Sequence, residues 1–203
     1  MSGRGQLTIS PAEATQAAAA AYAARDWAKA EQLCRLILAN CTDHFDALNL
    51  LGIIKAQTQH PEEAAALLGR AVAVRPDHAT AHNNYGNVLS DLNRFRDALA
   101  HYDRALELEP GYAEASNNRG GALRALGRLD AALASYDQAI ALRPDYAEAY
   151  YNRGVTFHDL GRLQEALGCY SRTLLLRPGF AAAHYNQGIA LHALRRLDEA
   201  LRS

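Results

Sequence analysis

Residues 113–146 read AEASNNRGGALRALGRLDAALASYDQAIALRPDY, and residues 147–180 repeat the pattern as AEAYYNRGVTFHDLGRLQEALGCYSRTLLLRPGF. The two stretches have the same length of 34 residues and keep Gly, Ala, Tyr and Pro at equivalent places. A looser match extends this period to earlier and later parts of the chain. Internal similarity at such a period is typical of a solenoid, in which short helical units stack on one another.

The period divides the chain into an extension and six repeats. The predicted boundaries are an N-terminal extension at 1–10, a degenerate first repeat at 11–44, complete repeats at 45–78, 79–112, 113–146 and 147–180, and a truncated sixth repeat at 181–203. The last stretch, LDEALRS at 197–203, is predicted to begin a second helix that breaks off. Because solenoids need a polar terminal cap, we interpret the chain as a fragment of a longer protein.

Each repeat has the pattern of two α-helices, because its apolar residues recur at the helical spacing. In 113–146, Gly127 is expected to end the first helix, since glycine readily adopts the left-handed conformation that closes helices. Pro144 is expected to stop the second helix, since proline has no N–H to donate. At the N-terminus, SPAE (Ser10 to Glu13) predicts a capping box that begins the first helix. The sequence therefore predicts an all-α protein.

Four places carry most of the similarity between repeats: glycine at the eighth, alanine at the twentieth, tyrosine at the twenty-fourth and proline at the thirty-second. These residues resemble the tetratricopeptide repeat (TPR) family over about residues 11–203. The resemblance implies a right-handed superhelical solenoid of helix-turn-helix hairpins. The family often has an aromatic residue at the fourth place, which Tyr150 keeps and from which His82, Ser116 and His184 depart.

Small residues at two places and an arginine at a third suggest how the helices of a repeat meet. Gly120 and Ala132 are small where the two helices are expected to cross closely, since a larger side chain would push them apart. Arg119 and Arg153 stand at the seventh place, where the family often has leucine. We expect their stems to cover apolar surface while each guanidinium group reaches water.

Asparagine occupies the sixth place of four successive repeats, as Asn84, Asn118, Asn152 and Asn186. Equivalent residues of stacked repeats form a row, and the TPR resemblance implies that this row faces the concave surface. An asparagine side chain offers both a donor and an acceptor. The row is therefore predicted to bind the backbone of an extended peptide. The alternative is a generic scaffold role, in which the asparagines bond neighbouring repeats.

Further side chains are predicted to line the same groove. They comprise polar neighbours of the row (Asn83, Asn87, Asn117), two tyrosines (Tyr151, Tyr185), and charged or imidazole residues (Asp91, Glu114, Arg124, Glu148, His158, Asp159). With Asp46, the acidic residues outnumber Arg124, which favours a neutral or basic peptide through charge complementarity. A solvated charged face and simple partial burial of the tyrosines are the alternatives.

Composition argues against several functional classes. Lysine and arginine number 21 against 22 aspartates and glutamates, giving a net charge of −1, so the basic excess of a nucleic-acid binder is missing. No apolar run reaches the roughly 18–20 residues that span a bilayer. Three scattered cysteines fit a reducing compartment. We therefore predict a cytoplasmic protein that binds neither nucleic acid nor membrane; the sequence predicts no oligomeric state.

No cofactor, metal or catalytic site is expected. His158 and His192 share the twelfth place of adjacent repeats, but no cysteine or carboxylate accompanies them at ligand spacing, and no phosphate-binding loop or nucleophile elbow is present. The segment is predicted to be a non-catalytic protein–protein interaction scaffold. Its phrases NNYGN and NNRGG also resemble the TPR arms of protein O-GlcNAc transferases and their bacterial relatives. That resemblance implies an alternative, the substrate-recruiting arm of a larger glycosyltransferase.

Overall fold

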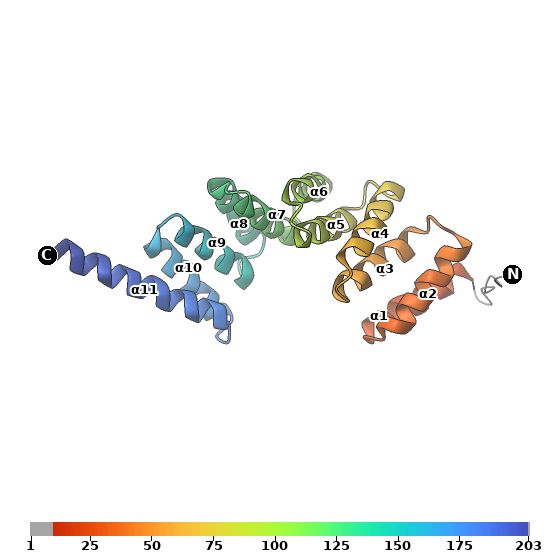
Figure 1. The fold of residues 1–203 in the computed structure, drawn as a ribbon, viewed down its shortest axis with the longest axis horizontal. Coiled ribbons are helices and arrows are strands. Elements are labelled where there is room, and N and C mark those ends of the chain that lie inside the picture. Colours follow the sequence, from red (N-terminus) through yellow and green to blue (C-terminus); the bar gives the residue numbers. More distant parts are fainter. Residues whose placement is uncertain (1–9, 203) are drawn as a thin grey trace. The chain divides into compact units, whose positions relative to one another are not determined.

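A computed structural model describes residues 10–202, with side chains up to Arg195. Across this range the chain forms eleven α-helices and no strand (Figure 1). The predicted all-α repeat fold is confirmed. The chain divides into two compact parts, an N-terminal half that ends at Leu108 and a C-terminal half that begins at Glu109, and each is described by itself.

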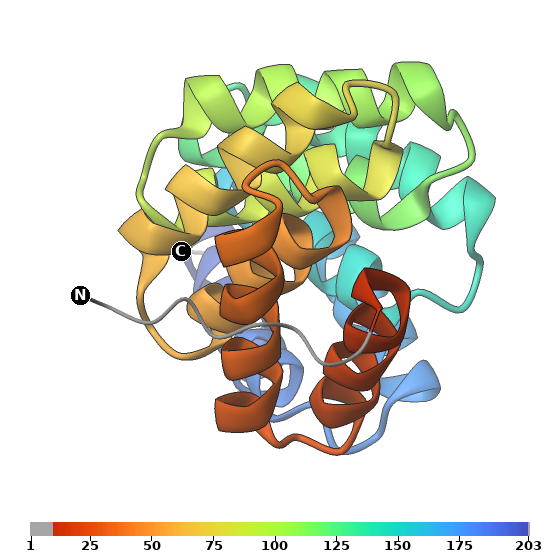
Figure 2. The same ribbon diagram turned by 90° about the vertical axis from the view of Figure 1, so that its right-hand side faces the viewer.

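The N-terminal half consists of three helical hairpins. Its helices are α1 (Pro11–Ala23), α2 (Trp27–Asn40), α3 (Phe45–Gln57), α4 (Pro61–Val74), α5 (Ala79–Asp91) and α6 (Phe95–Leu108). Figure 2 shows the first hairpin, α1 in red beside α2 in orange-red. Each first helix also packs against the second helix of the preceding hairpin, so the hydrophobic core continues from one repeat to the next.

The C-terminal half consists of two hairpins and a long final helix. Its helices are α7 (Ala113–Ala125), α8 (Leu129–Leu142), α9 (Ala147–Asp159), α10 (Leu163–Leu176) and α11 (Ala181–Arg202). The separate second helix predicted at 197–203 is wrong, because α11 runs without a turn from Ala181 to Arg202.

The turn inside each complete hairpin explains this difference. One residue there adopts a left-handed conformation, with φ of 59° at Arg25, 62° at Gln59, 58° at Asn93, and 72° at Gly127 and Gly161. A residue with a Cβ adopts it at a cost of about 1–2 kcal/mol, which packing of the second helix must offset. At the equivalent place of the sixth repeat, Arg195 stays within helix α11 and keeps the helical hydrogen-bonding pattern.

The predicted capping box at the start of α1 is confirmed. Ser10 Oγ accepts a hydrogen bond from the backbone N–H of Glu13 at 3.2 Å, and the Ser10 N–H donates to Glu13 Oε2 at 2.8 Å. The two bonds satisfy the backbone N–H groups of Ser10 and Glu13, which the first helical turn would leave unpaired. The hydrogen bond from the Ser10 backbone N–H, followed by one from the Ser10 side chain, holds the pKa of the Glu13 carboxyl below its usual value.

The eighth-place glycines make room for the aromatic ring at the twenty-fourth place. A Cβ added to Gly120 would lie 2.6 Å from a ring carbon of Tyr136, and one on Gly86 would lie 2.6 Å from a ring carbon of Tyr102. Both rings are buried, with exposed fractions of 1% and 2%. The closest contact of Gly120 within its repeat is therefore with the ring of Tyr136.

The seventh-place arginines bind the second helix of their own repeat. Arg119 Nη1 donates to Ser135 Oγ at 2.8 Å, and Arg153 Nε donates to Cys169 Sγ at 3.4 Å. Arg153 also forms an ion pair with Asp137. The expected guanidinium groups near solvent thus gain a partner inside the repeat, because the residue at the twenty-third place binds each of them.

Two of the fourth-place departures, His82 and His184, share one role. Their Nε2 atoms lie 3.1 Å and 2.9 Å from the carbonyl oxygens of Pro76 and Pro178, respectively. A carbonyl oxygen can only accept, so Nε2 donates in both cases. Each imidazole thereby ties its repeat to the proline that closes the preceding one.

A histidine pair, of which His82 is buried and His101 partly buried, makes the stability of the N-terminal half depend on pH. His82 Nδ1 lies 3.0 Å from His101 Nδ1. Since His82 Nε2 donates to Pro76, its Nδ1 accepts from the Nδ1–H of His101. Burial is the main cause that lowers the pKa of both imidazoles below the usual value. If His82 Nδ1 took up a proton, it would face the Nδ1–H of His101, and the two donors could not form a hydrogen bond.

We expect the unfolding free energy to fall as the pH drops below about 6.5, the usual histidine pKa. Below that pH the unfolded chain binds more protons than the folded chain, whose histidine pKa values are lowered, so protonation favours unfolding. Denaturant titrations between about pH 7.5 and 5 measure the slope. The slope should shrink in His101→Gln and persist in His192→Gln, which changes an exposed histidine. Equal slopes in both variants would contradict the assignment.

Candidate functional site

Three of the predicted site residues line one hollow in the N-terminal half. Asn84, Asn87 and Asp91 lie on the same face of α5, because residues three and four apart are neighbours on a helix. The hollow has a volume of about 360 Å³. It is also lined by Tyr22 of α1, by Ile53, Ala56 and Gln57 of α3, by Leu68 of α4 and by Val88 of α5. We call it the α5 hollow.

The polar side chains of the α5 hollow differ in how far their hydrogen-bonding capacity is used. Asn87 Oδ1 accepts from Tyr102 Oη at 2.9 Å, which fixes the orientation of this amide. Gln57 Nε2 donates to Tyr22 Oη at 2.8 Å. Among the described residues, the side chain of Asn84 makes no hydrogen bond, and Asp91 makes neither a hydrogen bond nor an ion pair.

The fifth-place asparagines lie inside the protein. Asn83 has an exposed fraction of 5% and Asn117 of 7%. Both were expected to widen the polar strip of the groove, but their side chains are almost fully buried. Asn117 donates from Nδ2 to Asn118 Oδ1 at 3.3 Å.

In the C-terminal half, sixth-place asparagines bond the preceding repeat. Asn152 Nδ2 donates to Asn117 Oδ1 at 3.0 Å, and Asn186 Nδ2 donates to Tyr151 Oη at 3.0 Å. The ring of Tyr151 packs against Phe180 with centroids 4.9 Å apart, so this tyrosine is partly buried. For these residues the geometry favours the scaffold role over the ligand-binding role.

The equivalent bond is missing at Asn84. The residue that should accept from it, at the fifth place of the preceding repeat, is Asn49. Its Oδ1 atom is buried and has no hydrogen-bond partner within the described part of the chain. The amide of Asn84 lines the α5 hollow and is not used between repeats.

The predicted acidic excess is largely neutralised within the protein. Glu114 forms an ion pair with Arg143 and Glu148 with Arg177. The remaining two pairs join Asp46 Oδ1 to Arg75 Nη1 at 3.9 Å and Asp159 Oδ2 to Arg124 Nε at 2.7 Å. Of the five acidic residues in the predicted groove, Asp91 is the one without such a pair among the described residues. Desolvation raises the pKa of its carboxyl above the usual value.

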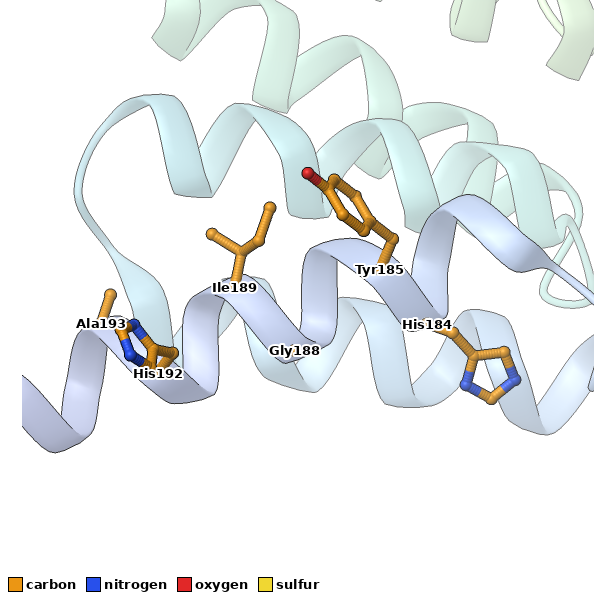
Figure 3. Close-up of a pocket in the computed structure, with 6 residues that line it drawn as sticks. All are labelled: His184, Tyr185, Gly188, Ile189, His192 and Ala193. Carbon is orange, nitrogen blue, oxygen red and sulfur yellow. The ribbon is translucent and has the colours of Figure 1, made fainter.

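A second hollow lies on α11 and contains Tyr185, another predicted site residue. Its volume is about 640 Å³, and Ile189, His192 and Ala193 help to line it. Figure 3 shows Tyr185 and Ile189 projecting from the same side of α11, whereas His184 points away from them. Tyr185 is 71% exposed. His158 lies half-buried on α9 and lines neither hollow.

The sequence analysis did not find Tyr22, Ala56 and Gln57 as site residues. Tyr22 lies in the degenerate first repeat, whose weak similarity hides its equivalence to later residues. Ala56 stands at the twelfth place, which Arg124 occupies two repeats later. An alanine opposite an acidic residue is a signal only once the arginine pair is known.

Neither a metal centre nor a membrane span is found among the described residues. Within residues 10–195, no group of three His, Cys, Asp or Glu side chains could hold a metal ion. No described helix combines the length and the apolar character needed to cross a bilayer.

Comparison with protein families decides the class of the repeats. Family models for TPR or tetratricopeptide repeats match residues 43–110, 120–161 and 147–180. The chain contains tetratricopeptide repeats. The matched residues cover both halves, and the TPR fold places the chain among protein-interaction scaffolds. No curated protein matches the chain.

Several solved structures share this TPR fold. The chain is 24% identical to YrrB, described as a TPR protein with an unusual peptide-binding site, with a TM-score of 0.70 and 88% of each chain covered. It is 23% identical to TTC0263, a thermophilic TPR protein of Thermus thermophilus (TM-score 0.71, 90% of this chain and 99% of that one). For MamA the identity is 21% and the TM-score 0.72, with 81% and 96% covered. None of the three tests the resemblance to O-GlcNAc transferase arms, which stays a prediction.

Proposed function

We propose that this TPR chain is a non-catalytic scaffold that binds an extended, neutral to basic peptide segment of a partner protein, with the α5 hollow as its main contact. The observation that supports the proposal is the difference between equivalent residues. Asn152 and Asn186 use their amides between repeats, whereas Asn84 makes no side-chain hydrogen bond to any residue that the structure describes and lines the hollow.

The chemistry of the α5 hollow suits a peptide. The amide of Asn84 can donate to a peptide carbonyl and accept from a peptide N–H. A volume of about 360 Å³ is at the small end of ligand sites and suits side chains of a segment more than a whole folded domain. Ile53, Leu68 and Val88 provide apolar surface beside these polar groups. In the C-terminal half, the exposed Tyr185 is the candidate for a further contact.

The compartment is part of the same proposal. All three cysteines are free, with Cys34 and Cys169 buried and Cys41 exposed. An exposed free thiol fits a reducing compartment such as the cytoplasm.

The proposal can be tested with a phage-displayed library of random dodecapeptides selected on the 203-residue chain, followed by calorimetry on enriched peptides. Asn84→Ala is expected to weaken binding about fivefold to tenfold, because one net hydrogen bond contributes about 1 kcal/mol, with unfolding unchanged. Asn152→Ala is the matched control at the same place of another repeat. It should lower the unfolding free energy by about 1–2 kcal/mol, since Asn117 Oδ1 loses its donor, and leave affinity unchanged.

Two results would contradict the proposal. The first is a selection that enriches no peptide on the chain. The second is an enriched peptide that binds wild type and Asn84→Ala equally well.

A further inference from the structure

The protein contains its own example of a guanidinium group bound between repeats. Arg124, at the twelfth place of one repeat, donates from Nε to Asp159 Oδ2 at 2.7 Å. Asp159 stands at the thirteenth place of the next repeat. The two residues lie on α7 and α9, the first helices of adjacent repeats, which contact each other.

The same two places meet in the α5 hollow with one of the partners missing. Asp91 stands at the thirteenth place of its repeat, as Asp159 does, and the twelfth place of the preceding repeat holds Ala56. Helices α3 and α5 contact each other in the N-terminal half, as α7 and α9 do in the C-terminal half. Ala56 and Asp91 both line the hollow. The carboxylate is therefore present and the arginine side chain that would neutralise it is absent.

We propose that the α5 hollow binds the guanidinium group of an arginine side chain, which donates to the carboxylate of Asp91 as Arg124 donates to Asp159. The inference rests on the proposed function, because the arginine belongs to the peptide segment that the hollow binds. It adds the residue type at one position of that segment.

Three considerations support arginine as the residue that the hollow binds. A planar guanidinium group donates two parallel hydrogen bonds to a carboxylate, which a lysine ammonium group cannot do. Tyr22 adds an aromatic ring to the lining, and guanidinium groups are attracted to the faces of such rings. Partial burial raises the pKa of the Asp91 carboxyl, and no cation pairs with this carboxylate among the described residues.

The test uses the 203-residue chain and a capped nonapeptide of glycine and serine with arginine at its centre. A peptide with citrulline at that position has almost the same shape and no charge. We expect the arginine peptide to bind about fivefold to tenfold more tightly, from the strength of charge-assisted hydrogen bonds at a partly exposed site. Trp27, the single tryptophan of the sequence, packs on Tyr22 with ring centroids 5.1 Å apart, so its fluorescence reports on binding.

Three variants assign the effect to this position. Asp91→Asn should remove the preference for arginine, whereas Asp77→Asn, the same change at an exposed residue of the same half, should keep it. Ala56→Arg should fill the hollow from inside, abolish the preference and lower the pKa of Asp91 in carboxyl NMR titrations. Ala56→Gln adds bulk without charge and should leave that pKa at or above its wild-type value.

The outcomes separate this inference from the proposed function. Equal affinity for the arginine and citrulline peptides would overturn the arginine site and leave peptide binding intact. If neither peptide binds, N-acetylarginine amide is the remaining probe. A shift of the Asp91 carboxyl signal with this probe would support the site and speak against the peptide. No shift would overturn both.

Discussion

Replacing Gly120 by leucine is expected to lower the unfolding free energy by about 3 kcal/mol, through overpacking of a filled core. Even the first carbon of the new side chain would lie 2.6 Å from the ring of Tyr136. This ring is 1% exposed and is held between the two helices of the repeat, so it cannot move aside without opening the hairpin. Urea unfolding followed by circular dichroism measures the loss.

The adjacent glycine provides a matched control. A Cβ on Gly121 would have its nearest neighbour, Tyr136 Oη, at 4.0 Å, and the residue is exposed. Gly121→Leu should therefore stabilise the helix by several tenths of a kcal/mol, because leucine is the better helix former. If both leucines changed stability equally, the close approach of Gly120 to the ring would be refuted.

The second large effect is expected from Glu31→Ala, which removes the main partner of a buried cation. Lys55 is 7% exposed, and its Nζ lies 2.7 Å from Glu31 Oε1 and 3.4 Å from Glu63 Oε2. Breaking a buried pair costs about 3–5 kcal/mol. Because Glu63 remains, we expect denaturant unfolding to show a loss of about 3 kcal/mol, the lower end of that range.

A double-mutant cycle isolates the ion pair. Lys55→Met keeps the apolar stem and removes the charge, so it should change stability by less than about 1 kcal/mol. In the Lys55→Met background, Glu31→Ala should then cost much less than in wild type. An undiminished cost in that background would mean that Glu31 acts through Arg35, to which it is also paired, and not through Lys55.

The fold could be predicted from sequence because the places that decide it act within one repeat. Gly120 and Tyr136 meet inside a single hairpin, so their spacing recurs with the period and can be read directly. The prediction was wrong at α11, where the sequence pattern indicated a turn and the helix continues. A pattern gives the place of a turn, but not whether packing stabilises it.

The site was harder to predict because its properties depend on contacts between repeats. Asn84 and Asn152 occupy the same place of their repeats. Of the two, Asn152 donates a hydrogen bond to the preceding repeat, and among the described residues Asn84 does not. The acidic bias was overestimated for a similar reason, since each arginine that neutralises Glu114, Glu148 or Asp159 lies in an adjacent repeat or just after the second helix of the same repeat, 29 or 35 residues away in sequence. Pairings of this kind appear only when the helices are in place.

The left-handed turn residues distribute conformational cost unevenly along the chain. All three turns of the N-terminal half use residues with a Cβ, at Arg25, Gln59 and Asn93, whereas both turns of the C-terminal half use glycine. Each of these three turns stores about 1–2 kcal/mol that local opening would release. The hairpins around the α5 hollow therefore have a smaller free energy of local unfolding, and their amide hydrogens should exchange more readily. A peptide bound in the hollow would raise that free energy and slow the exchange of these amide hydrogens.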